Sequence, residues 1–259
     1  MPDLILGPLL RYTGKSDATI WVATDADCEV EVRVEEAVHR SQTFRIEDHH
    51  YALIHVSGLT SDAVYEYSVD LDGVQAWPEP DSAFPPSIIR TLGEKEPFRI
   101  AFGSCRAAGP PDTTMFGKRD ESDIDALDAL ATRMSNEPLE YWPDALLLLG
   151  DQIYADEVSP ETLEYIRSRR DTKKPPGKEV ANFEEYTRLY WESWGDPVIR
   201  WLLSTVTSAM IFDDHDVNDD WNTSEAWVER MRTKPWWNDR ITGGFVSYWI
   251  YQHIGNLSP

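Results

Sequence analysis

The chain has 259 residues, of which 41% are hydrophobic and 27% are charged, a composition typical of a soluble globular protein rather than a disordered one. It carries 24 Lys and Arg residues against 46 Asp and Glu residues, which gives a net charge of −22. This charge argues against binding to nucleic acid or to an anionic membrane, because attraction to phosphate needs clustered Lys and Arg side chains.

Targeting signals and cysteines place further limits on the protein class. No apolar run approaches the roughly 20 residues of a membrane-spanning helix. The first residues, Met1 to Leu4, do not resemble a secretory signal, since no basic region precedes a long apolar one. Cys28 and Cys105 alone cannot make a disulfide framework. We therefore expect a cytoplasmic protein.

Residues 1–93 carry the pattern of short β-strands. Residues 18–23 are rich in strand-forming side chains, and Val30, Val32 and Val34 alternate with charged residues, which is the period of a half-buried strand. Several such segments with turn signals between them predict an N-terminal antiparallel β-sandwich. Residues 57–67 are similar to one corner of fibronectin type III domains.

Residues 94–259 predict an α/β fold, because strand and helix patterns alternate along this part of the chain. Strands are expected over residues 98–102, 144–149 and 209–212, the second as a strand buried on both faces. Helices are expected from a cap at Ser122 or Asp123 to Met134, over residues 183–190, and from Pro197 onward. The domain boundary is therefore predicted between residues 93 and 94.

Each of the three expected strands is followed by a loop that carries potential ligands. These loops contain Gly-Ser-Cys-Arg at residues 103–106, Gly-Asp-Gln-Ile-Tyr at residues 150–154, and Asp-Asp-His-Asp-Val-Asn-Asp-Asp at residues 213–220. In open α/β sheets, ligands bind outside the carboxyl ends of the strands. We therefore expect the three loops to form one site.

The third loop gives the strongest chemical signal, with five aspartates in eight residues. Carboxylates held that close repel one another unless a cation compensates them, which favours a metal site over a solvated acidic loop. Asp151 follows four leucines at the edge of a dry layer, where an unpaired carboxylate is costly. The alternative for Asp151 is the cap of a following helix.

The order and strand context of these three motifs resemble the PhoD-like (alkaline phosphatase D) metallophosphatases. The resemblance implies that the second region is part of a calcineurin-like metallophosphatase α/β sandwich with a two-metal site. In that site Asp151 would bridge both ions, Cys105 and Tyr154 would complete the first ion's ligands, and Asp214 would belong to the second. His215 would face the substrate phosphate, and Arg106 and Asn218 would be further phosphate contacts.

The chemistry implied by this resemblance is hydrolysis of a small phosphomonoester or phosphodiester by a hydroxide held between two ions. A thiolate and a phenolate suit Fe(III), whereas carboxylates suit a harder second ion such as Ca²⁺, Mn²⁺ or Mg²⁺. His215 would stabilise the departing oxygen by donating a hydrogen bond or a proton. Nothing in the sequence specifies an oligomeric state.

The sequence departs from the family pattern after Asn218. The family's later Ser-Gly-Asp-Val-His-like motif is missing, and the one remaining histidine, His253, lies in a helix-like apolar stretch. We therefore expect the chain to be the N-terminal portion of a longer protein. The alternative functions are a truncated, catalytically inactive metal-binding fragment and a binding module that Ca²⁺ stabilises.

Overall fold

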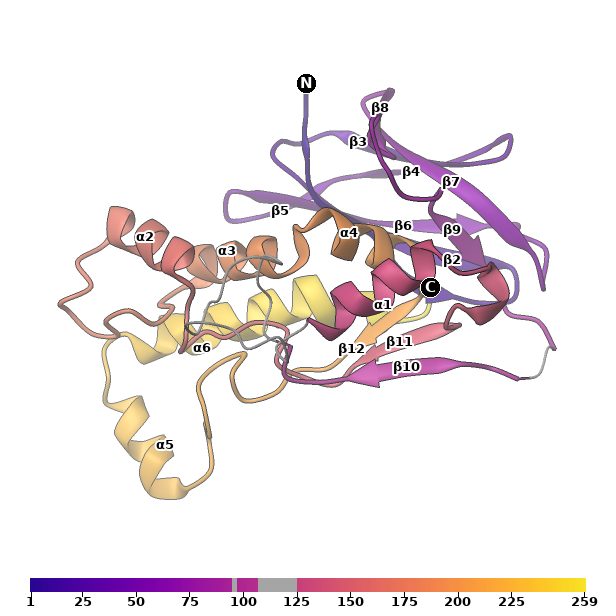
Figure 1. Ribbon diagram of the computed structural model, residues 1–259. Helices are drawn as coiled ribbons and strands as arrows, with labels where there is room; N and C mark the ends of the chain where they lie inside the picture. Colours follow the sequence, from indigo (N-terminus) through magenta and orange to yellow (C-terminus); the bar gives the residue numbers. More distant parts are fainter. Residues whose placement is uncertain (95–96, 107–124) are drawn as a thin grey trace.

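The fold is taken from a computed structural model that describes residues 1–94, 97–106 and 125–259 (Figure 1). Its strands are β1 (Leu4–Thr13), β2 (Asp17–Thr24), β3 (Glu29–Val34), β4 (Ala37–Gln42), β5 (Phe44–Ile46), β6 (His49–Ser57), β7 (Val64–Leu71), β8 (Val74–Trp77), β9 (Ile88–Arg90), β10 (Ile100–Gly103), β11 (Ala145–Leu148) and β12 (Ser208–Met210). Its α-helices are α1 (Ala126–Ser135), α2 (Pro160–Arg169), α3 (Phe183–Trp194), α4 (Pro197–Thr205), α5 (Glu225–Arg232) and α6 (Trp237–Ser247). Short 3-10 turns occur at Leu139–Tyr141 and Ile254–Asn256, and a π-helix, Tyr248–His253, directly follows α6.

Two antiparallel sheets form the N-terminal region, as the sequence predicts. One sheet has the strand order β1-β2-β6-β5, and the other has the order β4-β3-β7-β8 with β9 paired to β7. The inward-facing valines of β3 pack with Ile20 of β2 and Ile54 of β6 in one buried cluster. The period-two pattern of β3 is therefore the inner face of a β-sandwich, whereas the likeness to fibronectin type III domains stays a prediction.

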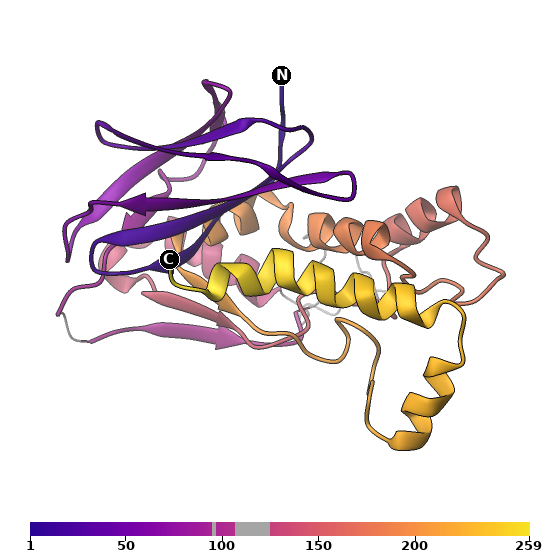
Figure 2. The same ribbon diagram turned by 180° about the vertical axis from the view of Figure 1, so that it is seen from behind.

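The sheet β1-β2-β6-β5 is buried on both faces and forms the middle layer of the molecule. Its second face carries Trp21 and Tyr51, whose rings lie 5.3 and 5.5 Å from the ring of Tyr251 in the π-helix. Tyr251 is stacked on Tyr190 of α3 at 4.2 Å. Figure 2 shows this layer lying against the long helices. One apolar core therefore crosses the domain boundary predicted after residue 93, and the boundary itself stays a prediction.

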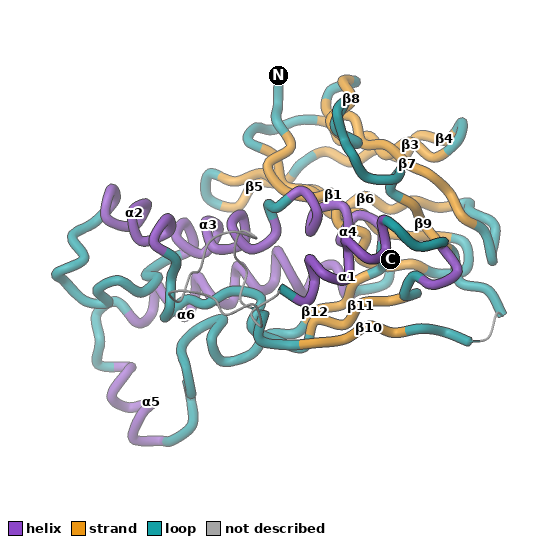
Figure 3. Tube along the Cα trace, in the orientation of Figure 1, coloured by secondary structure: helices purple, strands orange, loops and turns teal. Residues whose placement is uncertain are grey.

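The second region contains a parallel three-stranded sheet with the order β10-β11-β12, which confirms the predicted α/β character (Figure 3). Phe102 of β10 pairs with Leu147 of β11, which in turn pairs with Ala209 of β12. Leu146 and Leu148 of β11 pair with Ser208 and Met210 of β12. Leu146, Leu148 and Met210 share one face and are buried in the core that also contains side chains of α1 and α4.

The expectation that the central strand is buried on both faces is wrong, because Ala145 and Leu147 of β11 are only partly buried. On the other face of the sheet, Phe102 is 73% exposed, and Ile100 and Ile211 are each 50% exposed. Within the described ranges, no helix or second sheet covers this face, which lies along the lower side of the molecule in Figures 1 and 2. An apolar run indicates that burying a strand is favourable. The run does not show whether the chain contains a layer that covers the strand.

Other expected elements differ from the structure at their ends. Ser122 and Asp123, the expected caps of the first helix, lie outside the described residues, and the described cap of α1 is Asp125. Asp151 caps no helix, because Ser159 caps α2. Strand β12 ends at Met210, so Phe212 already belongs to the loop that follows. No helix among the described residues is long and apolar enough to cross a bilayer.

Substitutions on the two faces of the parallel sheet should differ strongly in their cost. Leu148→Ala should lower the free energy of unfolding by about 2–5 kcal/mol, because it leaves a cavity in the shared core. Phe102→Ser should change it by about 0.5 kcal/mol or less, because the side chain is already largely in water. Urea denaturation of the two variants measures both values. A large loss in Phe102→Ser would contradict the exposure of this face.

Candidate metal centre

The three loops converge because the strands that precede them are parallel and end at one edge of the sheet. The backbone of Gly150 has φ +120°, and a Cβ atom there would lie 2.4 Å from the Cβ atom of Asp213. Asp151 and Cys105 also adopt positive φ angles, +49° and +55°. The Cys105 amide donates to the carbonyl oxygen of Gly150 at 3.3 Å. Gly150 is therefore where the second loop passes close to both others.

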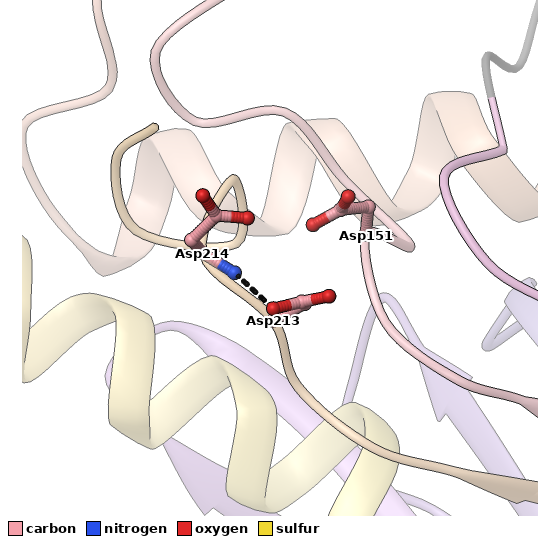
Figure 4. Close-up of side chains that lie close together, drawn as sticks. All are labelled: Asp151, Asp213 and Asp214. Atoms are coloured by element: carbon pink, nitrogen blue, oxygen red, sulfur yellow. Dashed lines mark hydrogen bonds between the residues drawn. The ribbon is translucent and has the colours of Figure 1, made fainter. Parts of the chain in front are cut away.

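Asp151, Asp213 and Asp214 form a compact cluster of carboxylates (Figure 4). Each offers one oxygen, and these oxygens all lie within 4.8 Å of one another. The amide of Asp214 donates to Oδ1 of Asp213 at 3.0 Å, which orders the two neighbours. The loops thus bring together two predicted ligands, Asp151 and Asp214, and add Asp213, which was not in the predicted ligand set.

The electrostatics of Asp151 fit a bound cation. This side chain is buried, and its Oδ1 atom has no hydrogen-bond partner among the described residues. Burial, together with the neighbouring carboxylates of Asp213 and Asp214, raises its pKa. A cation at the cluster would remove both penalties. Three carboxylates form a hard oxygen donor set, which suits Ca²⁺, Mn²⁺ or Mg²⁺.

Asp216 holds the second and third loops together. Its Oδ2 atom accepts hydrogen bonds from the amides of Asp151, at 3.2 Å, and Asp213, at 2.9 Å. The side chain is buried, and this burial raises its pKa to about 8. The sequence did not indicate that Asp216 is buried while its acidic neighbours are not, because residues in a loop show no periodic pattern of burial.

His215 is paired with Asp156, a residue of the second loop that sequence reasoning did not select. Nδ1 of His215 lies 3.0 Å from Oδ1 of Asp156, and the ring packs on Tyr154 with 4.9 Å between the ring centroids. Burial lowers the pKa of His215, but the hydrogen bond and charge of Asp156 outweigh it, so that the pKa is raised overall. The other ring nitrogen, Nε2, lies 3.8 Å from Oδ1 of Asp219.

Cys105 and Tyr154 lie within the field of the same acidic residues. The thiol of Cys105 is exposed, with Sγ 3.6 Å from Oγ of Ser104. The hydrogen bond to Ser104 lowers the pKa of this thiol, but Asp151 and burial raise it overall. Burial, then Asp151 and Cys105, raise the pKa of Tyr154. Both groups are therefore neutral without a cation, and a bound metal ion would favour their thiolate and phenolate forms.

Arg106, which the sequence predicts as a phosphate contact, is bound to protein groups in the structure, and its contact with phosphate stays a prediction. Its guanidinium forms a two-point ion pair with Asp125, at 3.0 and 2.8 Å, and also donates to the carbonyl oxygen of Ser193. These partners take up nearly all of its donors, so Arg106 fixes the first loop to α1 and α3.

Asn218 lies in the turn of the third loop. Its backbone N–H donates to the carbonyl oxygen of Asp214 at 2.6 Å, and its side-chain Nδ2 donates to the carbonyl oxygen of Asp219. His253 lies beside Tyr248 and is stacked on Trp249.

Gly150→Ala should disrupt the site more than an equivalent change elsewhere. The new methyl group would displace Asp213, so we expect both weaker Mn²⁺ binding and a loss of stability. Gly73→Ala is the control, since Gly73 has φ +77° but nothing within 4 Å of the added atom. The control should cost on the order of 1 kcal/mol from backbone strain alone and should leave Mn²⁺ binding unchanged. Calorimetric Mn²⁺ titration and thermal unfolding test both variants, and equal Mn²⁺ affinities would contradict the close approach.

Two regions of the chain match known protein families. Residues 1–89 match the model of a domain of unknown function (DUF7800), and residues 129–254 match the model of the PhoD-like phosphatase. No curated protein matches the sequence.

Solved structures match this fold to different degrees. The structure described as "Structure of PhoD" matches with a TM-score of 0.60 and 15% identity, over 99% of this chain and 46% of that one. A carbohydrate acetylesterase from Xanthomonas citri matches with a TM-score of only 0.25 and 10% identity, over 96% of this chain and 75% of that one, which carries no argument. The chain therefore has a PhoD-like fold and spans 46% of the length of the PhoD structure.

Proposed function

Because the chain resembles the PhoD-like phosphatases in its loop motifs, in the family model that residues 129–254 match and in its fold, we propose that it hydrolyses a small phosphoester. The reaction would take place at the acidic cluster of Asp151, Asp213 and Asp214. The observation that carries the proposal is the Asp151 carboxylate, which is buried with an unpaired oxygen and faces two further carboxylates. Such an arrangement is costly unless it holds a cation.

The donor atoms around Asp151 suit two different ions. We assign Fe(III) to the side of Cys105 and Tyr154, whose thiolate and phenolate are strong anionic donors. Asp151, Asp213 and Asp214 would hold Ca²⁺, Mn²⁺ or Mg²⁺. When bound, such ions lower the pKa of water and neutralise phosphate charge.

The remaining side chains bind and orient the phosphoester. With hydroxide supplied from water, the ester P–O bond would break as the new P–O bond forms, Nε2 of His215 would donate a proton to the departing oxygen, and the proton released from water would pass to solvent. Asp156 holds the ring in place and raises the pKa of His215. Asn218 would contact the phosphate from the third loop, whereas Arg106 would act by fixing the first loop through Asp125.

A second candidate function is a truncated, catalytically inactive metal-binding fragment. It is favoured by the uncovered apolar face around Phe102 and Ile211, and by the 46% share of the PhoD structure that the chain spans. In this case the acidic cluster would bind a cation without completing a catalytic site.

Asp151→Asn should abolish metal binding and hydrolysis while leaving the fold intact. We expect no iron or manganese in the purified variant by elemental analysis, and no turnover of p-nitrophenyl phosphate or bis(p-nitrophenyl) phosphate. The metal-free variant should unfold at a higher temperature than the metal-free wild type, because one buried carboxylate of the repelling cluster is gone. Asp48→Asn is the matched control, since it makes the same charge change at a side chain that is 87% exposed.

The wild type distinguishes the two functions. Bound metal with turnover supports the phosphoesterase, and bound metal without turnover supports the inactive fragment. A wild type that binds neither iron nor manganese would contradict both.

Asp156→Asn should slow the reaction without weakening metal binding. Loss of the carboxylate lowers the pKa of His215 and frees its ring, so we expect kcat to fall on the order of 10-fold or more. The dissociation constant of Mn²⁺, measured by calorimetry, should stay the same because Asp156 does not belong to the carboxylate cluster. An unchanged kcat would remove His215 from the proposed mechanism.

A further inference from the structure

The π-helix Tyr248–His253 brings a polar side chain to the back of the acidic cluster. π-helical turns are rare and frequently occur at functional sites. Within this one, the side chain of Gln252 is fully buried. Its Nε2 atom donates to Oδ1 of Asp216 at 3.0 Å and to the hydroxyl of Tyr190 at 2.8 Å. Gln252 therefore binds the carboxylate that joins the second and third loops.

Asp216 uses its two oxygens in different directions. Oδ1 accepts from Gln252, whereas Oδ2 accepts from the amides of Asp151 and Asp213. The side-chain amide of Gln252 thus fixes the rotation of a carboxylate whose other oxygen sets the backbone of two cluster residues. A carboxylate with only one oxygen held would be free to tilt, and both loops would move with it.

Arg11 of β1 holds the π-helix in place from the opposite side. Its guanidinium donates to the carbonyl oxygens of Tyr251, at 2.8 Å, and Gln252, at 2.6 Å. It also donates to the carbonyl oxygen of Ser208 in β12 and to Oδ1 of Asn256. A cation at the C-terminal end of a helix is favourable, and four acceptors on one buried guanidinium leave the π-helix little freedom.

We propose that Gln252 is a positioning residue of the acidic cluster, which sets the backbone of Asp151 and Asp213 through Asp216 and thereby the affinity of the cluster for a divalent cation. Its effect on the loop backbone is independent of the phosphoesterase proposal, whereas its effect on metal affinity rests on that proposal. Hydrogen-bonded partners behind metal ligands typically change metal affinity about 10- to 100-fold when they are removed.

Two variants separate this role from simple packing. Gln252→Met keeps the length of the side chain and removes the donor to Asp216. Tyr190→Phe removes the other acceptor of the same amide, keeps the ring stacked on Tyr251, and leaves the bond to Asp216 in place. A purely structural role of Gln252 would make the two variants alike.

Two measurements test the proposal on the full chain. Amide hydrogen exchange of the metal-free protein, followed by NMR, should be about 10-fold faster at Asp151 and Asp213 in Gln252→Met, and unchanged in Tyr190→Phe. Calorimetric titration with Mn²⁺ alone should give a dissociation constant about 10- to 100-fold higher in Gln252→Met, and an unchanged one in Tyr190→Phe.

Several outcomes would overturn the proposal. Unchanged exchange or unchanged Mn²⁺ affinity in Gln252→Met would do so, as would an equal loss of affinity in Tyr190→Phe. If Gln252→Met does not fold, the wild type decides, because amides of Asp151 and Asp213 that exchange without protection cannot be held by Asp216. A wild type that protects both amides but binds neither Mn²⁺ nor iron supports the positioning of the loops and contradicts the phosphoesterase proposal instead.

Discussion

The geometry of the acidic cluster depends on one buried carboxylate, that of Asp216. The cluster places three carboxylates together, and their mutual repulsion would push the second and third loops apart. Asp216 opposes this because it accepts backbone hydrogen bonds from both loops at once. Burial raises the pKa of Asp216, and three N–H donors, one from each loop and one from Gln252, offset part of the cost of burying its charge. The protein thus holds a repelling arrangement in place before any cation binds.

The N-terminal sandwich contributes to the same arrangement from a distance. Its sheet β1-β2-β6-β5 supplies Trp21 and Tyr51 to the aromatic cluster around Tyr251. The same strand β1 supplies Arg11 to the carbonyl oxygens at the end of the π-helix. The sandwich is therefore more than an appended module, because it forms the layer against which the π-helix and β12 are positioned.

The sequence predicted well what depends on local pattern. Alternating valines indicated β3, apolar runs indicated β10, β11 and β12, and the residues that follow these runs included Asp151 and Asp214. What it did not predict depends on contacts between distant segments. The pairing of His215 with Asp156, and of Arg106 with Asp125, requires knowing which loops meet.

Burial and covering layers were the other properties that the sequence could not give. Asp213 and Asp216 belong to one run of acidic residues, yet one lies at the open cluster and the other is buried behind it. Gln252 lies in an apolar stretch, and nothing in that stretch indicates a specific hydrogen bond for its side-chain amide. The apolar residues next to Phe102 in the sequence predict a core position. Phe102 is nevertheless exposed, because no layer among the described residues covers its side of the sheet.

The position of the cluster at the rim of the sheet determines what it can bind. Asp216 and Gln252 approach it from the covered side, whereas Asp213 is exposed and Asp214 is half-buried. Ca²⁺ takes six to eight oxygen ligands, whereas Asp151, Asp213 and Asp214 offer one oxygen each to the cluster. Asp214 also belongs to a second carboxylate group, with Asp219 and Asp220. The cluster is thus held on its buried side through Asp216 and Gln252, and it is open to solvent at Asp213.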